Sequence, residues 1–259
     1  MGKTKHKAPE DGRPADGAAA RRPASPTGSS DAARQAVLQR SHRKLAASFP
    51  HAVHAADLQG EELAPSQPGF LMHVRNFLSP EECAAMIASS EEVGLNPPSL
   101  KDLRPRKGEA LLNRESFAFE DPLFGAALWT RMERFLPRDV SGRTPYGVTS
   151  RLRYYKYSKG HSFGQHVDQL VKGEGGSESE YTALFYLNGQ GDAPYNLAGG
   201  ETVFWKTAKE ELHSFSPTQG SLLLHAHGRR CLMHEGLEVT KGCKHLFRCD
   251  VLYSSPPPR

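Results

Sequence analysis

His166 and Asp168, separated by one residue, and His234 further along the chain are residue types that bind metals. Two imidazoles and one carboxylate form the facial triad that holds non-haem Fe(II) and leaves the opposite face of the ion open. On an extended strand, residues i and i+2 point to the same side, so His166 and Asp168 can bind one metal while Val167 points away. An HxD pattern is common by chance, so the rest of the chain must support this interpretation.

Other histidines and other metals are open alternatives at this point. His225 and His227 lie close to His234 in the sequence, and an HxH pair can also bind a metal. Zinc and copper bind such ligands more tightly than iron does, so the residue types also allow a zinc- or nickel-loaded cupin-like enzyme. We interpret the cysteines that flank this region as small core residues and not as ligands: Cys231, Cys243 and Cys249.

The composition indicates a chain that is only partly folded. Hydrophobic residues make up 37% of its 259 residues, which is low for a compact domain. The net charge of +4 is too small to indicate nucleic acid binding, and four cysteines without CxxC spacing indicate reduced thiols. No apolar segment of signal-peptide or membrane-spanning type is evident, so we expect a cytoplasmic or nuclear protein that does not bind membranes.

The folded domain is expected over residues 66–255. Residues 1–65 are expected to form a disordered basic N-terminal tail, with a short helix possible between Asp31 and Phe49. Within the domain, Ser79 and Glu82 form a capping-box pattern that predicts a helix ending near Gly94.

A second helix is predicted after Asp121, where Pro122 suits the first turn. The turn-rich basic segment 95–112 is either a loop that contacts the substrate or a solvated insertion.

The second half of the chain shows a pattern of short strands separated by turns that contain glycine or proline. We predict strands over 152–157, 163–167, 181–188, 201–205, 221–225, 231–235 and 244–253. This spacing is typical of a β-sandwich or jelly roll, so we expect a mostly β fold with supporting α-helices outside it.

Several motifs extend the HxD pattern in order along the chain. They are Tyr157 nine residues before His166, the segment Tyr181–Asn188, Gly199-Gly200-Glu201-Thr202, His234-Glu235-Gly236, Val239–Lys244 and Arg248–Tyr253. With these motifs, residues 68–253 resemble the catalytic domain of the 2-oxoglutarate and Fe(II)-dependent prolyl 4-hydroxylases. The resemblance implies a double-stranded β-helix (jelly-roll) core, and Fe(II) bound by His166, Asp168 and His234.

The resemblance also implies a binding site for 2-oxoglutarate. The distal carboxylate of this co-substrate needs a fixed cation, and the family places a basic residue ten positions after the last histidine, where Lys244 stands. Arg248, on the same face of the same strand, is the competing anchor, although Asp250 could hold it as a structural partner. Tyr157 and Tyr186 match family positions whose hydroxyl groups can assist.

The expected function is therefore a dioxygenase of the procollagen-proline 4-dioxygenase type. It would use Fe(II), 2-oxoglutarate and O₂, with ascorbate as reductant, to hydroxylate prolyl residues of an intracellular protein or peptide. Two alternatives stay open: the same chemistry on a different substrate, because the triad does not fix what is placed before it, or a non-catalytic jelly-roll binding module.

Overall fold

The computed structural model describes residues 30–52, 58–64 and 71–255. The disorder expected for the basic tail before residue 30 lies outside the described residues. Among the helices that are described, none combines the length and the apolar character needed to cross a lipid bilayer.

Four α-helices are described: α1 (Asp31–Ala52), α2 (Pro80–Val93), α3 (Leu100–Leu103) and α4 (Pro122–Met132). Helix α2 begins and ends as the sequence predicts. Ser79 accepts a hydrogen bond from the backbone of Glu82, the Glu82 carboxylate accepts one from the backbone of Ser79, and Gly94 ends the helix with a φ of 68°. Helix α4 starts at Pro122, where the side chain of Asp121 accepts the backbone N–H of Phe124.

The strands form two facing antiparallel sheets and one small ribbon. The larger sheet has the order β1 (Gly60–Glu62), β2 (Leu71–Val74), β12 (Leu222–Ala226), β8 (Glu178–Tyr186), β15 (Cys243–Tyr253), β6 (Arg151–Ser158) and β4 (Glu115–Glu120), and β5 (Pro145–Val148) also pairs with β15. The smaller sheet has the order β11 (Glu210–Phe215), β10 (Thr202–Thr207), β13 (Met233–Gly236), β7 (Ser162–His166) and β3 (Leu112–Asn113). The ribbon pairs β14 (Val239–Lys241) with β9 (Ala198–Gly199).

The chain therefore has the jelly-roll architecture that its strand pattern predicts. All seven strands predicted after residue 150 are present, as β6, β7, β8, β10, β12, β13 and β15. The sequence reading missed β4 and β5, and it missed β11, a largely exposed and polar strand at the edge of the smaller sheet. The segment 95–112 is not the plain loop that the sequence predicts, because it contains α3 and reaches the start of β3.

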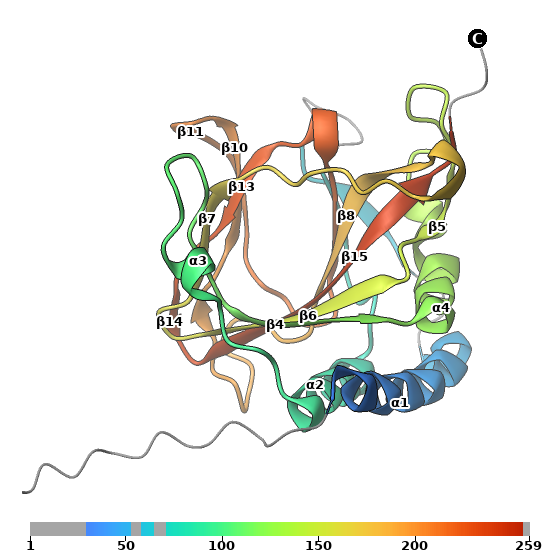
Figure 1. The fold of residues 1–259 in the computed structure, drawn as a ribbon, viewed down its shortest axis with the longest axis horizontal. Coiled ribbons are helices and arrows are strands. Elements are labelled where there is room, and N and C mark those ends of the chain that lie inside the picture. The colour runs from blue at the N-terminus through green and yellow to red at the C-terminus, as the bar shows by residue number, and fades with distance from the viewer. Residues whose placement is uncertain (1–29, 53–57, 65–70, 256–259) are drawn as a thin grey trace, which may run out of the picture.

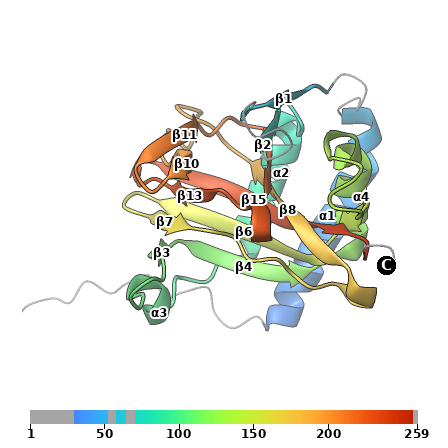
Figure 2. The same cartoon turned by 90° about the horizontal axis from the view of Figure 1, so that it is seen from above.

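The helices cover the face of the larger sheet that points away from the smaller sheet. Figure 1 and Figure 2 show α1, α2 and α4 together on this side, with β10, β13 and β7 on the other. One hydrophobic cluster fills the space between the helices and the larger sheet, and a second lies between the two sheets. We call these the helix-side core and the barrel-side core. The larger sheet thus has two buried faces.

Helix α1 is longer than the helix that the sequence indicated, and it belongs to the helix-side core. Leu38, Leu45 and Phe49 are buried there, on the face that their spacing predicts. The guanidinium of Arg34 lies 3.8 Å from the ring centre of Phe117 and donates a hydrogen bond to the carbonyl of Val93. Residues 31–52 are therefore packed against the domain, although composition placed them with the N-terminal tail.

Candidate active site

The ends of β7 and β13 bring the two expected histidine ligands together. These strands are paired with His234 opposite His166, so the two rings lie side by side with their centres 4.2 Å apart. Asp168 follows β7 by two residues and is buried, whereas the side chain of Val167 is 41% exposed. The alternation expected from the HxD pattern is therefore present.

The donor atoms of these three residues converge. Nε2 of His166 lies 3.7 Å from Oδ1 of Asp168, and Nε2 of His234 lies 3.9 Å from Oδ2. All three ligand atoms are within 4.8 Å of one another. The spacing of the three residues thus predicted a real cluster.

Backbone carbonyls fix the orientation of both imidazoles. Nδ1 of His166 is 2.8 Å from the carbonyl oxygen of Gly164, and Nδ1 of His234 is 2.9 Å from that of Leu232. A ring nitrogen that donates to a carbonyl carries the proton, which leaves Nε2 with its lone pair facing Asp168. This is the arrangement that a metal-binding histidine requires.

The protonation states also suit a cation. Burial, together with the nearby His234, lowers the pKa of His166 to about 3, and burial lowers the pKa of His234. Burial by itself would raise the pKa of Asp168, but Arg248 and the neighbouring imidazoles hold it well below its usual range. The cluster therefore presents neutral imidazoles and an ionised carboxylate. Two nitrogen donors and one oxygen donor on one side of a cavity fit Fe(II), so His166, Asp168 and His234 could hold it.

The cluster opens into a cavity between the two sheets. Tyr157 and Lys244 line this cavity together with the three ligand candidates. Lys244 is 2% exposed, and its Nζ donates a hydrogen bond of 2.6 Å to the carbonyl of Gly200. A buried ammonium on the wall of the cavity is the feature that a distal carboxylate would require.

Gly200 and the two tyrosines define the surroundings of Lys244. Gly200 has a φ of 76°, and a Cβ there would lie 3.2 Å from Cδ of Lys244, so the backbone approaches the lysine more closely than another residue would allow. Nζ of Lys244 lies 5.4 Å from the ring centre of Tyr157 and 5.5 Å from that of Tyr186. The pKa of Lys244 is lowered to about 7, mainly by burial, with Glu201 raising it and Arg114 lowering it by smaller amounts.

The two tyrosines take different positions. The hydroxyl of Tyr157 accepts a hydrogen bond of 2.8 Å from Arg114 and borders the cavity. The hydroxyl of Tyr186 is 2.7 Å from Oγ1 of Thr202, and Tyr186 is not among the residues that line the cavity. Tyr157 is therefore placed to contact a ligand, whereas Tyr186 packs its ring near Nζ of Lys244 without lining the cavity.

Arg248, the competing anchor expected from the sequence, lies beside Asp168. Its guanidinium contacts both carboxylate oxygens of Asp168 at 3.1 Å, and Nη2 donates to Oγ1 of Thr182 at 3.2 Å. The expected pairing with Asp250 is also present, at 2.9 Å, and Arg153 holds the other oxygen of Asp250 at 2.8 Å. Arg248 thus fixes the carboxylate of the metal cluster.

Arg114 is a site residue that the sequence reading missed. Its guanidinium lies 3.7 Å from the ring centre of Tyr155 and 4.9 Å from that of Phe163, and the ring of Phe163 stacks on His166 at 3.5 Å. Among the described residues, Nε of Arg114 has no hydrogen-bond partner. The alternating residues of β4, which begins directly after Arg114, were the signal that could have placed it at the barrel.

His227, considered above as a possible ligand, has a structural role. Its Nδ1 is 3.0 Å from Oγ1 of Thr182, and its Nε2 is 2.8 Å from Oγ of Ser179. Both ring nitrogens are therefore occupied, and His227 offers no free donor to a metal.

Comparison with known proteins agrees with this geometry. Residues 152–249 match the 2OG-Fe(II) oxygenase superfamily. This segment resembles a 2OG-Fe(II) oxygenase domain. It contains β6, where Tyr157 lies, and the elements that carry His166, Asp168, His234, Lys244 and Arg248.

Solved structures show the same fold. The viral collagen prolyl hydroxylase of Paramecium bursaria Chlorella virus-1, determined with 2-oxoglutarate, is 17% identical, with a TM-score of 0.51 over 71% of this chain and 97% of that one. The prolyl hydroxylase of Trichoplax adhaerens, in complex with a peptide fragment of the hypoxia inducible factor oxygen degradation domain, is 15% identical, with a TM-score of 0.50 over 83% of this chain and 91% of that one. A search of curated proteins finds no match.

Proposed function

We propose that this 2OG-Fe(II) oxygenase hydroxylates prolyl residues of an intracellular protein or peptide, in the cytoplasm or nucleus. The observation that carries the proposal is the arrangement of one cavity, with His166, Asp168 and His234 at one part of its wall and the buried Lys244 at another. A 2-oxo acid with a second carboxylate is the kind of molecule that such a wall can hold at both ends.

Each residue has a separate task in this proposal. His166, Asp168 and His234 hold Fe(II), which when bound couples the oxidative decarboxylation of 2-oxoglutarate by O₂ to the hydroxylation of a C–H bond. Lys244 binds the distal carboxylate of the co-substrate, and the hydroxyl of Tyr157 lies beside it.

Arg248 keeps the carboxylate of Asp168 in place through the two contacts described above. Orienting a metal ligand in this way typically changes metal affinity or activity by about 10- to 100-fold. Ascorbate would serve as reductant.

A polypeptide substrate is supported by the surface next to the cluster. A second hollow, lined by Lys101, Pro105, Leu112 and Val167 among others, reaches His166 and Asp168. Exposed apolar side chains gather on this side, namely Leu100, Leu103, Leu111 and Val167. The two solved prolyl hydroxylases with this fold are described as a collagen prolyl hydroxylase and as a complex with a peptide fragment. These observations favour a protein or peptide over a small molecule.

The proposal is tested in two stages with the full chain. Under anaerobic conditions, addition of Fe(II) and 2-oxoglutarate should produce the visible charge-transfer absorption of a 2-oxo acid bound to Fe(II), and Asp168→Ala should not. With O₂ and ascorbate, proline-rich peptides should stimulate succinate release and gain one oxygen atom by mass spectrometry.

Matched peptides with each proline replaced by alanine are the control. Absence of the absorption would contradict the metal and co-substrate assignment. Absorption and succinate release without any prolyl oxidation would contradict only the substrate, and would favour the same chemistry on a different molecule.

A further inference from the structure

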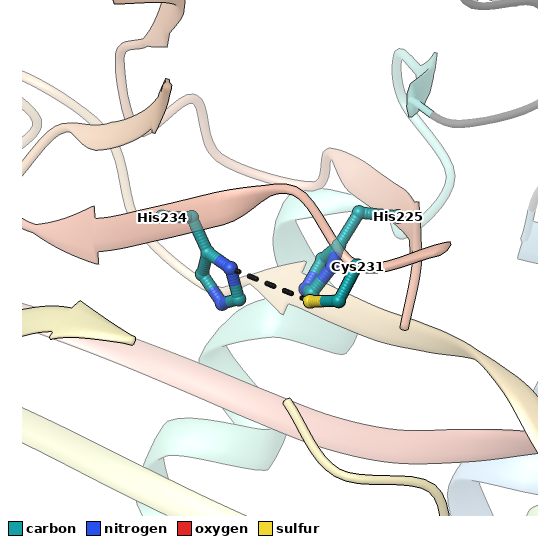
Figure 3. A group of neighbouring side chains, drawn as sticks. All are labelled: His225, Cys231 and His234. Carbon is teal, nitrogen blue, oxygen red and sulfur yellow. Dashed lines mark hydrogen bonds between the residues drawn. The ribbon is translucent and has the colours of Figure 1, made fainter. Parts of the chain in front are cut away.

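A second group of side chains that could bind a metal overlaps the proposed Fe(II) site, because both groups contain His234. Figure 3 shows His225, Cys231 and His234 with their donor atoms turned toward one another. One ligand atom from each residue lies within 4.8 Å of the others, and Sγ of Cys231 is 3.9 Å from Nδ1 of His234. Both histidines are buried and Cys231 is half-buried.

His225 provides an independent indication of a ligand. The residue is 1% exposed, and its Nε2 has no hydrogen-bond partner among the described residues. This nitrogen lies 3.7 Å from Oδ2 of Asp168, which is too far for a hydrogen bond. A buried polar nitrogen without a partner costs about 1–3 kcal/mol, so such an atom is rarely left in a structural role. By contrast, His227, two residues away, has a hydrogen-bond partner at both ring nitrogens.

The local fold holds Cys231 in place. The chain leaves β12 at Ala226, turns through the short 3₁₀ helix Gly228–Arg230, and returns along β13. Within this return, Sγ of Cys231 accepts the backbone N–H of Asp168 at 3.2 Å. The thiol is thus fixed between the chain that carries Asp168 and the ring of His234.

We propose that His225, Cys231 and His234 form a second metal site, for a thiolate-binding divalent ion such as zinc. Two imidazoles and one thiolate are ligands that Zn²⁺ prefers, and three protein ligands leave a fourth position open. The neighbouring group His166, Asp168 and His234 offers only nitrogen and oxygen donors, so the sulfur distinguishes the two sites. On coordination, the thiol of Cys231 releases its proton to solvent and a sulfur lone pair forms the bond to the metal. This proposal differs from the interpretation of Cys231 as a small core residue, and its half-buried side chain is compatible with either role.

The two sites share His234 but use different nitrogens of its ring. Nε2 faces Asp168, whereas Nδ1 faces Sγ of Cys231 and donates to the carbonyl of Leu232. A metal bound at Nδ1 displaces the proton of that nitrogen and so breaks this hydrogen bond, which fixes the ring for Fe(II). Zinc bound to Cys231 would therefore change the orientation of one Fe(II) ligand and weaken Fe(II) binding.

Cobalt is a suitable probe of this site, because Co(II) substitutes for zinc and a thiolate bound to it absorbs in the near ultraviolet. The full chain is freed of metal with a chelator and titrated with Co(II). The band should appear and saturate in the wild type and in His166→Ala, which retains all three ligands of the second site. It should be absent in Cys231→Ser and weakened at least several-fold in His225→Asn. Cys243→Ser, which changes another half-buried cysteine, should keep it.

Three results would overturn the proposal. No band in the wild type would mean that the group does not bind a metal. A band in Cys231→Ser would mean that the sulfur comes from elsewhere. Loss of the band in His166→Ala would mean that Cys231 is only an additional ligand of the iron cluster.

A measurement on the wild type alone covers the case in which the variants do not fold. Alkylation of the thiols by iodoacetamide is followed by mass spectrometry of the peptide that contains Cys231. Zn²⁺ should slow alkylation of Cys231 roughly tenfold or more, because only the free thiolate reacts. Mg²⁺ should have no effect. Equal rates with and without Zn²⁺ would reject the site.

Discussion

The helix-side core and the barrel-side core share the larger sheet but differ in how most of their buried polar groups are bonded, although Nδ1 of His245, on the helix-side face of β15, also lacks a partner among the described residues. On the helix side, Arg131 donates four hydrogen bonds, to both carboxylate oxygens of Glu82 and to the carbonyls of Phe77 and Phe49. His42 is bonded there at both ring nitrogens, to Asp121 at 3.1 Å and to Tyr154 at 2.9 Å.

On the barrel side, polar atoms are left open. In the described part of the chain, Nε of Arg114 and Nε2 of His225 are buried without partners, and both residues line the cavity. The Nε2 atoms of His166 and His234 lie 3.7 and 3.9 Å from Asp168. Buried groups whose hydrogen bonds are complete stabilise the fold, whereas incomplete ones that line a cavity are candidates for contact with a ligand.

Strand β15 shows how one segment serves both cores. Phe247, Cys249 and Val251 pack in the helix-side core, while Lys244, Leu246 and Arg248 line the cavity. Side chains of a strand alternate between faces, so each second residue belongs to the same core. The comparison therefore predicts which substitutions change stability and which change chemistry.

The largest effect on activity is expected at the proposed Fe(II) site. His166→Ala removes one of the three proposed ligands and should abolish turnover, while the free energy of unfolding should fall by only about 1 kcal/mol, from the lost hydrogen bond between Nδ1 and the carbonyl of Gly164. Activity assays with Fe(II) and chemical denaturation measure the two quantities. His213→Ala, on β11 of the same sheet, is the control. If His166→Ala retained near-normal Fe(II)-dependent activity, His166 would not be a ligand.

A large loss of stability is expected for a substitution in the helix-side core. Glu82→Ala leaves the buried guanidinium of Arg131 without its carboxylate, which typically costs about 3–5 kcal/mol. Urea denaturation should show this loss, and the folded fraction should keep its affinity for 2-oxoglutarate. Glu81→Ala, at the exposed neighbouring position, is the matched control. A change in co-substrate affinity with unchanged stability would contradict the separate roles of the two cores.

Substitutions of Lys244 and Arg248 should affect different steps, namely co-substrate binding and Fe(II) binding. Lys244→Ala removes a charge-assisted contact in a buried site, which costs about 2–5 kcal/mol and raises the KM for 2-oxoglutarate tens-fold or more. Arg248→Ala frees the carboxylate of Asp168 and should instead weaken Fe(II) binding, measured by metal titration.

Lys241→Ala, at an exposed position on β14, is the control for Lys244. The reverse pattern, with the KM raised only in Arg248→Ala, would transfer the anchor role to Arg248.

The smallest effect is a dependence of co-substrate binding on pH. Burial lowers the pKa of Lys244 to about 7, and the dianion binds the protonated ammonium. Affinity should therefore be complete below pH 7 and fall above it, by up to about tenfold per pH unit. Calorimetry at pH 6.5 and 8.5 would measure this, together with proton uptake at the higher pH. Lys244→Arg, whose side chain stays charged, should show a flatter profile, and an equal slope in both proteins would assign the effect to another group.

The sequence alone was sufficient where a local rule applies. The capping box at Ser79 and Glu82 sets the start of α2, and alternation places His166 and Asp168 on one side of the chain. The seven strands between residues 152 and 253 could be recognised because turn residues separate them. These features depend on residues close together in the chain.

Features that depend on which strands become neighbours could not be recognised. The contact between Arg248 and Asp168 requires β15 to pair with β8 and the end of β7 to lie across the barrel. The packing of α1 depends on three apolar residues in an otherwise polar segment, which composition cannot distinguish from a solvated helix. Cys231 looked like a core residue because its approach to His234 is set by a turn.

The double use of β15 also limits how this protein can change over evolutionary time. β15 pairs with β5, β6 and β8, so its register is fixed along its length. Insertion or deletion of a single residue within it would exchange the two faces, placing Phe247 toward the cavity and Lys244 toward the helices. Substitutions can be selected one position at a time, but changes of length there cannot. Length differences between this protein and its relatives are therefore expected in segments such as 187–197 and not in this strand.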